Sequence, residues 1–427
     1  MDPVGSENPG RLLLLLPTTT YRADAFMDAA RKIDVPITVA SEFPSSFENS
    51  TNPELLTLDL ANPLRAVAQA KDFAIDHPVV GVLGVDDDTT FVAAHIAAEL
   101  RLLGNDPVAT DTVRNKRSQR EALKDADLPV PWFVSAGLEE DPRELVRRIS
   151  FPCVLKPVNL SASRGVIRAD DENEFLAARE VLVSIVKEEC AGSKRPVESE
   201  FLVEEYLPGR EFAVEGLVTD GTLQPLAIFE KPDPLEGPYF EETILVTPPN
   251  LQPSDRQRLT HLVQSAASAL GIGHGAVHVE VRLNESGAWL VEFHARPIGG
   301  KCSRTLRFGA EGESSLEDLL VRNALGVLSD VPERMHNAEG VMMIPIPKSG
   351  KLLDVSGVEA ALGVLNVEDV VITAVKGREL VPLPRGSQYL GFIFARADTN
   401  AEVVDALRRA HGELEIKVGR TEGQMAG

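Results

Sequence analysis

The first hundred residues alternate between short apolar runs and longer stretches with helical spacing of apolar residues. The expected strands cover residues 12–16, 36–40 and 79–85, and the expected helices cover residues 22–33, 63–75 and 89–103. Strands that alternate with helices in this way form a parallel sheet with covered faces. No glycine-rich dinucleotide fingerprint follows the first strand, and the sequence contains no phosphate loop of the Walker type.

A second pattern, strict alternation of apolar and polar residues, runs from residue 276 to residue 296. It predicts a β-hairpin whose polar face carries histidine, glutamate and arginine side chains. With residues 285–287 as a three-residue loop and Gly287 in the left-handed conformation, the register brings like residues face to face. The facing pairs are Glu280 with Glu292 and His278 with His294.

Two facing carboxylates on one face of a sheet indicate a divalent-cation site. The Cβ atoms of facing residues lie about 5 Å apart, where like charges repel. A cation that bridges Glu280 and Glu292 would remove this penalty. Hard oxygen ligands suit Mg²⁺ or Mn²⁺, and Mg²⁺ usually takes one or two carboxylates together with substrate phosphates. The alternative is a half-exposed hairpin in which both glutamates pair with Arg282 and Arg296.

Composition narrows the class of protein. The chain has 427 residues, enough for about two to four structural domains. A formal net charge of -22 argues against nucleic acid and anionic membranes as partners, because no basic surplus exists to neutralise phosphates. The three cysteines share no metal-like spacing and cannot form a disulfide framework, which favours a cytoplasmic setting.

The middle of the chain has features that suit a nucleotide. Residues 151–157 form an expected strand with Lys156 near its end, and the small, hydroxyl-bearing residues 161–166 can close over a polyphosphate beside that lysine. An ordinary surface loop is the alternative for this stretch. Residues 201–207 form an expected strand that ends in two glutamates, an edge that can offer backbone groups to an adenine. Glu211 follows it, with a carboxylate suited to ribose hydroxyls.

Two further segments complete an ordered set of motifs: Lys116 lies within the segment 111–120, and Arg296-Pro-Ile-Gly299-Gly300 follows the hairpin. In order and spacing these motifs resemble the ATP-grasp superfamily of carboxylate–amine (or carboxylate–thiol) ligases, over roughly residues 75–330 and more weakly to the end. The chain is most similar to L-amino-acid ligases and carnosine-synthase-like enzymes. The resemblance implies that ATP binds to Lys116, Lys156, Ser161, Ser163, Arg164, Gly165, Glu204, Glu205, Leu207 and Glu211.

The resemblance also implies the architecture. It is an α/β protein with an ATP-grasp fold, an N-terminal Rossmann-like domain of the biotin-carboxylase type and a C-terminal α+β subdomain. The expected parts are an N-terminal domain (1–110), a linker helix with the ATP-grasp lid subdomain (111–205), the catalytic core (206–328) and a C-terminal subdomain that completes the core (329–427). The resemblance leaves a homodimer open as the assembly.

The implied activity is ATP-dependent ligation of a small carboxylate to an amine, through an acyl phosphate and with Mg²⁺ or Mn²⁺ as cofactor. Such phosphoryl transfer depends on positioning and cations more than on covalent catalysis. Arg296 would grip the substrate carboxylate and then the oxyanion. Candidate metal or substrate contacts are His278 and His294, the latter where many members have asparagine, and candidate substrate contacts are Glu242, Lys301 and Arg304.

Three other interpretations share the ATP site. A biotin-carboxylase-like enzyme would generally need a biotin carrier, and no Ala-Met-Lys-Met-like attachment site occurs in the sequence. A purine-pathway ligase has the same architecture, so the fold alone leaves the substrate open. The third is a non-catalytic ATP-binding protein, against which the retained lysines, glutamates and arginine argue.

Overall fold

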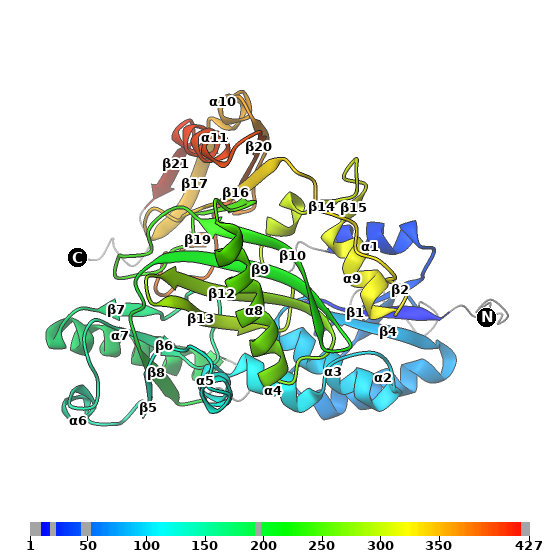
Figure 1. Cartoon of the computed structure of the whole chain (residues 1–427), viewed down its shortest axis with the longest axis horizontal. Coiled ribbons are helices and arrows are strands. Elements are labelled where there is room, and N and C mark those ends of the chain that lie inside the picture. The colour runs from blue at the N-terminus through cyan, green and yellow to red at the C-terminus, as the bar shows by residue number, and fades with distance from the viewer. Residues whose placement is uncertain (1–9, 18–22, 44–52, 193–197, 420–427) are drawn as a thin grey trace.

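The N-terminal domain is built on a four-stranded parallel sheet with the strand order β3-β2-β1-β4 (Figure 1). The computed structural model of the chain describes residues 10–17, 23–43, 53–192 and 198–419. The elements of this domain are β1 (Arg11–Leu15), α1 (Ala23–Lys32), β2 (Ile37–Ser41), β3 (Leu55–Thr57), α2 (Pro63–Asp76), β4 (Val79–Gly84) and α3 (Asp87–Leu100). The predicted alternation of strands and helices is confirmed. The extra strand β3 has only three half-buried residues, too few for the pattern to reveal.

Strand β1 is apolar throughout its centre because both of its faces are covered. Leu12 and Leu14 belong to the core that also contains residues of α1 and of a later helix, α9 (Leu316–Ala324). Leu13 and Leu15 point the other way and pack with residues of α2 and α3. An uninterrupted apolar run is therefore what this strand requires.

The lid subdomain is a four-stranded antiparallel sheet with the order β5-β8-β6-β7 and the long helix α7 packed on it. The elements from the linker onward are α4 (Pro107–Arg114), α5 (Lys116–Asp125), β5 (Phe133–Gly137), α6 (Pro142–Val146), β6 (Cys153–Pro157), β7 (Ile167–Ala169), α7 (Glu172–Gly192) and β8 (Glu200–Glu205). The linker, expected as one helix, consists of the two helices α4 and α5 instead. Asn115 leaves the helical conformation and caps α5, since its side-chain oxygen accepts a hydrogen bond from the Ser118 N–H at 3.0 Å.

The centre of the molecule is an eight-stranded sheet with the order β13-β12-β9-β10-β11-β16-β20-β18. Its core elements are β9 (Arg210–Thr219), β10 (Thr222–Lys231), β11 (Ile244–Thr247), α8 (Pro253–Ala269), β12 (Gly275–Asn284), β13 (Gly287–His294), η1 (Cys302–Thr305), β14 (Arg307–Phe308), β15 (Ser314–Ser315) and α9. The elements that follow are β16 (Ala338–Ile344), β17 (Gly350–Ser356), α10 (Val358–Leu362), β18 (Val367–Ile372), β19 (Glu379–Leu380), β20 (Gly391–Ala397), α11 (Asn400–Gly412) and β21 (Glu415–Gly419). Strands from the last hundred residues thus extend the central sheet (Figure 1).

The register of the β12–β13 hairpin is as predicted where it concerns the site: Glu280 faces Glu292 and His278 faces His294. The loop, however, is one residue shorter than predicted, because Asn284 already pairs with Gly287. A bulge opposite the step from residue 280 to residue 281 restores the register. Gly287 has φ +134°, a positive value as predicted.

One face of the hairpin is a core face and the other is polar. Val277, Val279, Val281 and Phe293 are fully buried against residues of α8. The side chains between them point to the opposite face of the sheet, where the glutamates and histidines gather. None of the helices in the described part of the chain combines the length and the apolar character that a membrane span needs.

Candidate active site

A cavity of about 1080 Å³ lies where the polar face of the hairpin meets the lid subdomain, the N-terminal domain and the C-terminal segment. Its walls combine residues that are distant in the sequence. The predicted site residues that line it are Lys116, Lys156, Ser161, Ser163, Glu204, Glu205, Leu207, Glu211, Glu242, His278, Glu280, Glu292, His294 and Arg296. This cavity is the candidate active site.

Two buried lysines reach the cavity from different elements. Lys116 starts α5; its ammonium group lies 2.9 Å from Glu292 and donates to the carbonyl of Leu160 at 2.6 Å. Lys156 lies in β6, with its ammonium group 2.6 Å from Glu204. Because only about a tenth of each lysine side chain is exposed (10% and 9%), both charges depend on these partners more than on water. They are the cations that a polyphosphate would meet on this wall.

Glu204 is held by two cations. The Arg120 Nε donates to it at 2.8 Å, and Lys156 contacts its other oxygen. Burial alone would raise the pKa of this carboxyl, but Arg120 and Lys156 together lower the pKa to about 2. Its backbone lies in the middle of the lid sheet, paired with β5 and β6. Side chain and backbone of Glu204 are thus both engaged in this structure, where its carboxylate anchors Lys156, and its contact with ATP stays a prediction.

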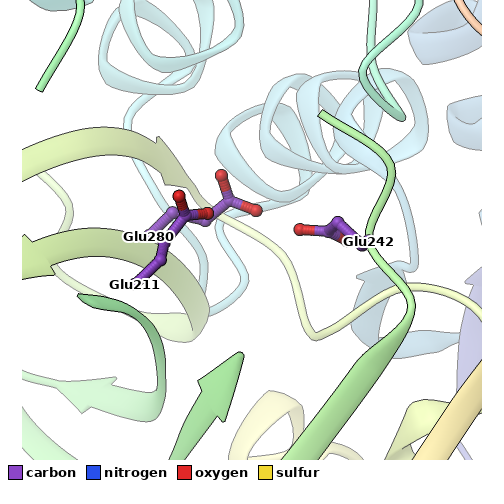
Figure 2. A group of neighbouring side chains, drawn as sticks. All are labelled: Glu211, Glu242 and Glu280. Atoms are coloured by element: carbon purple, nitrogen blue, oxygen red, sulfur yellow. The ribbon is translucent and has the colours of Figure 1, made fainter. Parts of the chain in front are cut away.

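Three carboxylates, from Glu211, Glu242 and Glu280, converge on one side of the cavity (Figure 2). Each offers an oxygen within 4.8 Å of the other two. Lys231, which is not among the predicted site residues, lies 2.7 Å from Glu211 and 3.1 Å from Glu280, and also contacts Glu242. Burial opposes its charge, but the carboxylates raise the pKa of Lys231 well above the ordinary value. Lys231 is the last residue of the apolar strand β10, a position like that of Lys156 in β6. This position is the sequence signal that could have identified Lys231.

Glu211 uses both of its oxygens. One accepts from Lys231 at 2.7 Å, and the other accepts from the Arg282 Nε at 2.7 Å. Its carboxylate lines the cavity at the end of β9 near the lid. The predicted contact with an ATP ribose stays a prediction, because a ribose hydroxyl would have to share these oxygens with the two cations.

The carboxylates of the hairpin fit a hard divalent cation. Glu280 and Glu292 face each other, and two more carboxylates lie beside Glu280. Lys231 and Lys116 neutralise this pair. A set of close oxygen donors, with buried lysines next to it, suits Mg²⁺ or Mn²⁺ bound together with a nucleotide.

His278 and His294 stack on the polar face of the hairpin, with ring centroids 5.7 Å apart. The His278 Nδ1 contacts Glu215, and its Nε2 lies 3.8 Å from Glu280. Burial opposes the imidazolium charge, but Glu215 and Glu280 raise the pKa of His278 to about 9. His278 is therefore a cation at neutral pH, which favours a positioning role near Glu280.

Asp87 joins the N-terminal domain to the hairpin. Its carboxylate lies 2.9 Å from the His294 Nδ1 and accepts a hydrogen bond from the Arg296 Nε at 3.0 Å. The other nitrogen of His294 lies 3.2 Å from Glu292. Arg296 lines the cavity, as expected, but its salt-bridge partner is Asp87 and not Glu292. Asp87 follows the carboxyl end of β4, where ligands of parallel sheets gather, and this position is the signal that could have identified it.

Two predicted substrate contacts lie outside the cavity. Arg304 donates to Asp369 at 2.8 Å and lies over the ring of Phe394, so the short helix η1 turns it away from the cavity. Lys301, just before that helix, is not among the lining residues either. The substrate contact of Arg304 stays a prediction, although in this structure an acidic strand residue, Asp369, pairs with its guanidinium.

The loop of residues 161–166, which is predicted to close over phosphates, lies only partly at the cavity. Ser161 and Ser163 line the cavity, whereas Arg164 and Gly165 are turned toward the C-terminal segment and do not line it. The Gly165 N–H donates to the Pro384 carbonyl at 2.8 Å. The Arg164 side chain donates to the carbonyl of Arg385 and pairs with Glu189 of α7. Arg164 and Gly165 thus hold the loop in place in this structure, and their contact with ATP stays a prediction.

Comparisons with known proteins agree with this geometry. Residues 149–305 match the ATP-grasp domain, and residues 342–419 match the L-amino acid ligase C-terminal domain 2. Alanine–anticapsin ligase of Bacillus subtilis is 28% identical over 286 residues, which cover 61% of this chain and 58% of that ligase. The chain thus spans less than two thirds of the length of that relative.

Solved structures match over nearly the whole chain. The crystal structure of L-amino acid ligase from Bacillus licheniformis has a TM-score of 0.79 and 25% identity, and the match covers 97% of this chain and 100% of that chain. Carboxyaminoimidazole ribonucleotide synthase from Aspergillus clavatus, complexed with ATP, has a TM-score of 0.71 and 19% identity over 94% of this chain and 98% of that chain, a likeness of fold alone. The predicted fold class is confirmed. The chain thus contains an ATP-grasp domain, followed by a C-terminal domain of the L-amino acid ligase type.

Proposed function

We propose that this protein is an ATP-dependent carboxylate–amine ligase that joins small molecules, such as amino acids, through an acyl phosphate. The observation that carries the proposal is the meeting in one cavity of two buried lysines, Lys116 and Lys156, with the facing carboxylates of Glu280 and Glu292 and the guanidinium of Arg296. ATP is the co-substrate and Mg²⁺ or Mn²⁺ the cofactor. Cys153 and the two other cysteines form no disulfide among the described residues, which is consistent with the cytoplasm as the setting.

The chemistry explains why such a cavity is needed. A carboxylate is a poor acyl donor, because expelling oxide is too costly. A carboxylate oxygen therefore attacks the γ-phosphorus of ATP, ADP leaves, and an acyl phosphate forms. The amine then attacks the carbonyl carbon, phosphate leaves with the former carboxylate oxygen, and the nitrogen gives up a proton. The products are an amide, ADP and phosphate.

Each step depends on charge that the protein holds in place. Lys116 and Lys156 bind phosphate oxygens, and the loop 161–166 excludes water from the reaction. When bound, the divalent cation at Glu280 would neutralise charge on the phosphates. Arg296 binds the substrate carboxylate and then the oxyanion, for which a guanidinium offers paired donors.

Glu242 is the proposed contact for a substrate amino group. It is a cavity carboxylate in the segment between β10 and β11, and in this structure it binds the ammonium group of Lys231. The ammonium group of an amino acid has the same charge and the same three donors. Lys231 therefore marks a position in the cavity where an alkylammonium group is stable.

The C-terminal match favours an amino-acid ligase over the other ATP-grasp activities. Biotin carboxylase and the purine-pathway synthases share the fold at identities of 13% to 19%, which supports architecture and not substrate. The L-amino acid ligase of Bacillus licheniformis is matched over its full length, including its C-terminal part.

The test is a screen of amino-acid pairs with ATP and Mg²⁺, scored by phosphate release and by product mass. The proposal predicts at least one pair that yields a condensed product with ADP and phosphate in equal amounts. Stoichiometric AMP and pyrophosphate would contradict it, as would phosphate release without a condensed product in every pair. Glu292→Gln, prepared in parallel, separates the activity from that of a contaminating ATPase.

A further inference from the structure

We propose that Arg282 is a positioning residue for the nucleotide: it directs the carboxylate of Glu211 to a ribose hydroxyl and fixes the hinge, residues 205–207 at the end of β8. The inference rests on the proposed function for ATP as the co-substrate. Arg282 lies in β12, two residues after Glu280, and lines the cavity.

Arg282 is a buried cation. Only 5% of its side chain is exposed. Burial opposes its charge, but Glu211 raises the pKa of Arg282 above the ordinary value. A buried guanidinium depends on acceptors for its N–H groups, so the partners of Arg282 decide what its charge does in the fold.

The guanidinium joins three parts of the chain. Its Nε donates to Glu211 at 2.7 Å, and its terminal nitrogens donate to the carbonyl of Leu207 and, at 3.3 Å, to the carbonyl of Leu235. Leu207 belongs to the hinge, and Leu235 lies in the segment between β10 and β11. All three partners line the cavity. Because the donors of a guanidinium form a rigid planar fork, they fix these three wall residues relative to one another.

Two cations set the direction of the Glu211 carboxylate, each on its own oxygen. Lys231 donates to one oxygen at 2.7 Å, and Arg282 donates to the other at 2.7 Å. Lys231 also contacts Glu242 and Glu280, which form the carboxylate cluster with Glu211 (Figure 2). Without Arg282 the carboxylate could turn toward Lys231. Arg282 thus keeps one oxygen of Glu211 on the side of the hinge.

The order of these contacts along the wall matches the order of parts in a nucleotide. Arg282 links Glu211 to Leu207 of the hinge, and Lys231 links Glu211 to Glu280 of the proposed cation site. Glu211 therefore lies between an edge suited to a base and a site suited to phosphates, where a ribose would be. Its two oxygens have about four acceptor positions, and the two cations take one each, so ribose hydroxyls can share them.

Tyr206 strengthens the same corner of the cavity. The guanidinium of Arg282 lies 5.2 Å from the centre of its ring, and that of Arg168 lies 4.0 Å from it. The Tyr206 hydroxyl donates to the Leu235 carbonyl at 3.4 Å, the same carbonyl that Arg282 binds. Loss of the Arg282 fork should therefore loosen the hinge as well as release Glu211.

Binding of three nucleotides tests this role without turnover. ADP, 2′-deoxy-ADP and 3′-deoxy-ADP are titrated calorimetrically into the full-length protein with Mg²⁺. The wild type should bind at least one deoxy form about ten- to a hundredfold more weakly than ADP, the range of a hydrogen bond to a charged group. Arg282→Met, which removes the charge, should reduce this ratio to about threefold or less. A wild type without discrimination, or a wild-type ratio in Arg282→Met, would overturn the proposal.

Glu211→Gln shows whether Arg282 acts through Glu211. The amide has one acceptor oxygen and no charge, so it should lose the discrimination to the same extent as Arg282→Met. Discrimination that is lost in Arg282→Met but kept in Glu211→Gln would mean that the arginine itself meets the ribose, which would contradict a positioning role.

Arg210→Met is the matched control. Arg210 precedes Glu211 on β9, but it is exposed and pairs with Glu230 at 2.6 Å. Its affinity for ADP and its ratio should match the wild type.

Arg282→Lys decides the matter if Arg282→Met does not fold. Lysine keeps a charge beside Glu211 but lacks the fork that holds Leu207 and Leu235. This variant should keep the discrimination and bind all three nucleotides about tenfold more weakly. An affinity for ADP within about twofold of the wild type would overturn the role at the hinge.

The titrations also separate this inference from the proposed function. Discrimination that depends on Arg282, in a protein that joins no pair of substrates, would leave the inference standing and count only against the ligase. Ligase activity with a ratio that Arg282→Met does not change would do the reverse. A wild type that binds none of the three nucleotides would overturn both.

Discussion

The ammonium group of Lys116 lies 2.9 Å from a carboxylate oxygen of Glu292, and this ion pair joins helix α5 to the hairpin. Burial tends to raise the pKa of Glu292, but Lys116 and His294 lower it. The Glu292 carboxylate is thus an anion that Lys116 and His294 stabilise. A change at this one position should affect the nucleotide and the cation together.

Glu292→Gln should lower ATP-dependent phosphate release by orders of magnitude, and excess Mg²⁺ should recover little of it. The amide keeps the shape of the side chain but loses the charge that holds the cation and faces Lys116. Steady-state phosphate release over a range of Mg²⁺ concentrations is the measurement. Glu285→Gln, at the exposed tip of the same hairpin, is the control. Near-normal turnover in Glu292→Gln would rule out this glutamate as a metal ligand.

Arg296→Ala should leave ATP binding nearly intact and impair turnover. Its proposed partner is the substrate carboxylate and then the oxyanion, and a lost oxyanion donor typically costs about a hundredfold or more in kcat. Calorimetric titration with ATP and Mg²⁺, beside steady-state kinetics, separates the two effects. If ATP affinity falls as far as in Glu292→Gln, then Arg296 acts only by ordering the metal site.

Arg385→Ala should loosen the loop of residues 161–166. The Arg385 side chain donates to Glu188 at 2.9 Å and to Ser184 at 3.1 Å on α7, next to the loop contact at Pro384. Hydrogen exchange in residues 161–166 should be faster than in the wild type without nucleotide, and ATP with Mg²⁺ should slow it in both proteins. The apparent KM for ATP should rise by about two- to fivefold, in line with a partly exposed ion pair.

The control for the loop is Arg409→Ala, which removes another partly exposed arginine, on α11, with a carboxylate partner one turn away. Its exchange in residues 161–166 should match the wild type. Unchanged exchange in Arg385→Ala would mean that the contact with α7 does not hold the loop.

Glu204 should make stability depend on pH in the acid range. Its folded pKa of about 2 lies below the ordinary 4.5, because Arg120 and Lys156 outweigh the effect of burial. The stabilisation is therefore fully present above about pH 5 and is lost as the pH falls from 4.5 toward 2, a contribution of about 3 kcal/mol. Urea unfolding between pH 7 and 3.5 should show a gap between wild type and Glu204→Gln that narrows below pH 4.5. A gap that stays constant over this range would contradict the assignment.

The hairpin shows what a sequence pattern can and cannot predict. Alternation identified the two strands and set Glu280 opposite Glu292, because side-chain direction has a period of two along a strand. The length of the hairpin loop could not be predicted from the same alternation. The shorter loop and the bulge near residue 291 compensate for each other, so the correct pairing hid an incorrect turn. Such compensation depends on packing from outside the hairpin. At the bulge, the Arg120 side chain donates a hydrogen bond to the carbonyl of Val291.

The site residues that could not be predicted from the sequence are those whose partners are distant along the chain. Asp87 meets His294 across 207 positions, and Lys231 meets Glu280 across 49. Neither pairing follows from local periodicity, since the first depends on how the N-terminal domain packs on the hairpin and the second on the strand order of the central sheet. Arg304 was predicted at the site because it follows the glycines. Its side chain instead points toward strand β18 of the C-terminal segment, where it donates to Asp369.

The acyl phosphate is the centre of the account, and oxygen transfer tests it most directly. The carboxylate substrate, once a productive pair is known, is labelled with oxygen-18 in both oxygens, and the inorganic phosphate formed in a single incubation is analysed by mass spectrometry. Each phosphate released should carry one labelled oxygen, and phosphate should equal the amide and ADP in amount. Unlabelled phosphate beside a full yield of amide, or label in AMP, would contradict activation of the carboxylate by the γ-phosphoryl group.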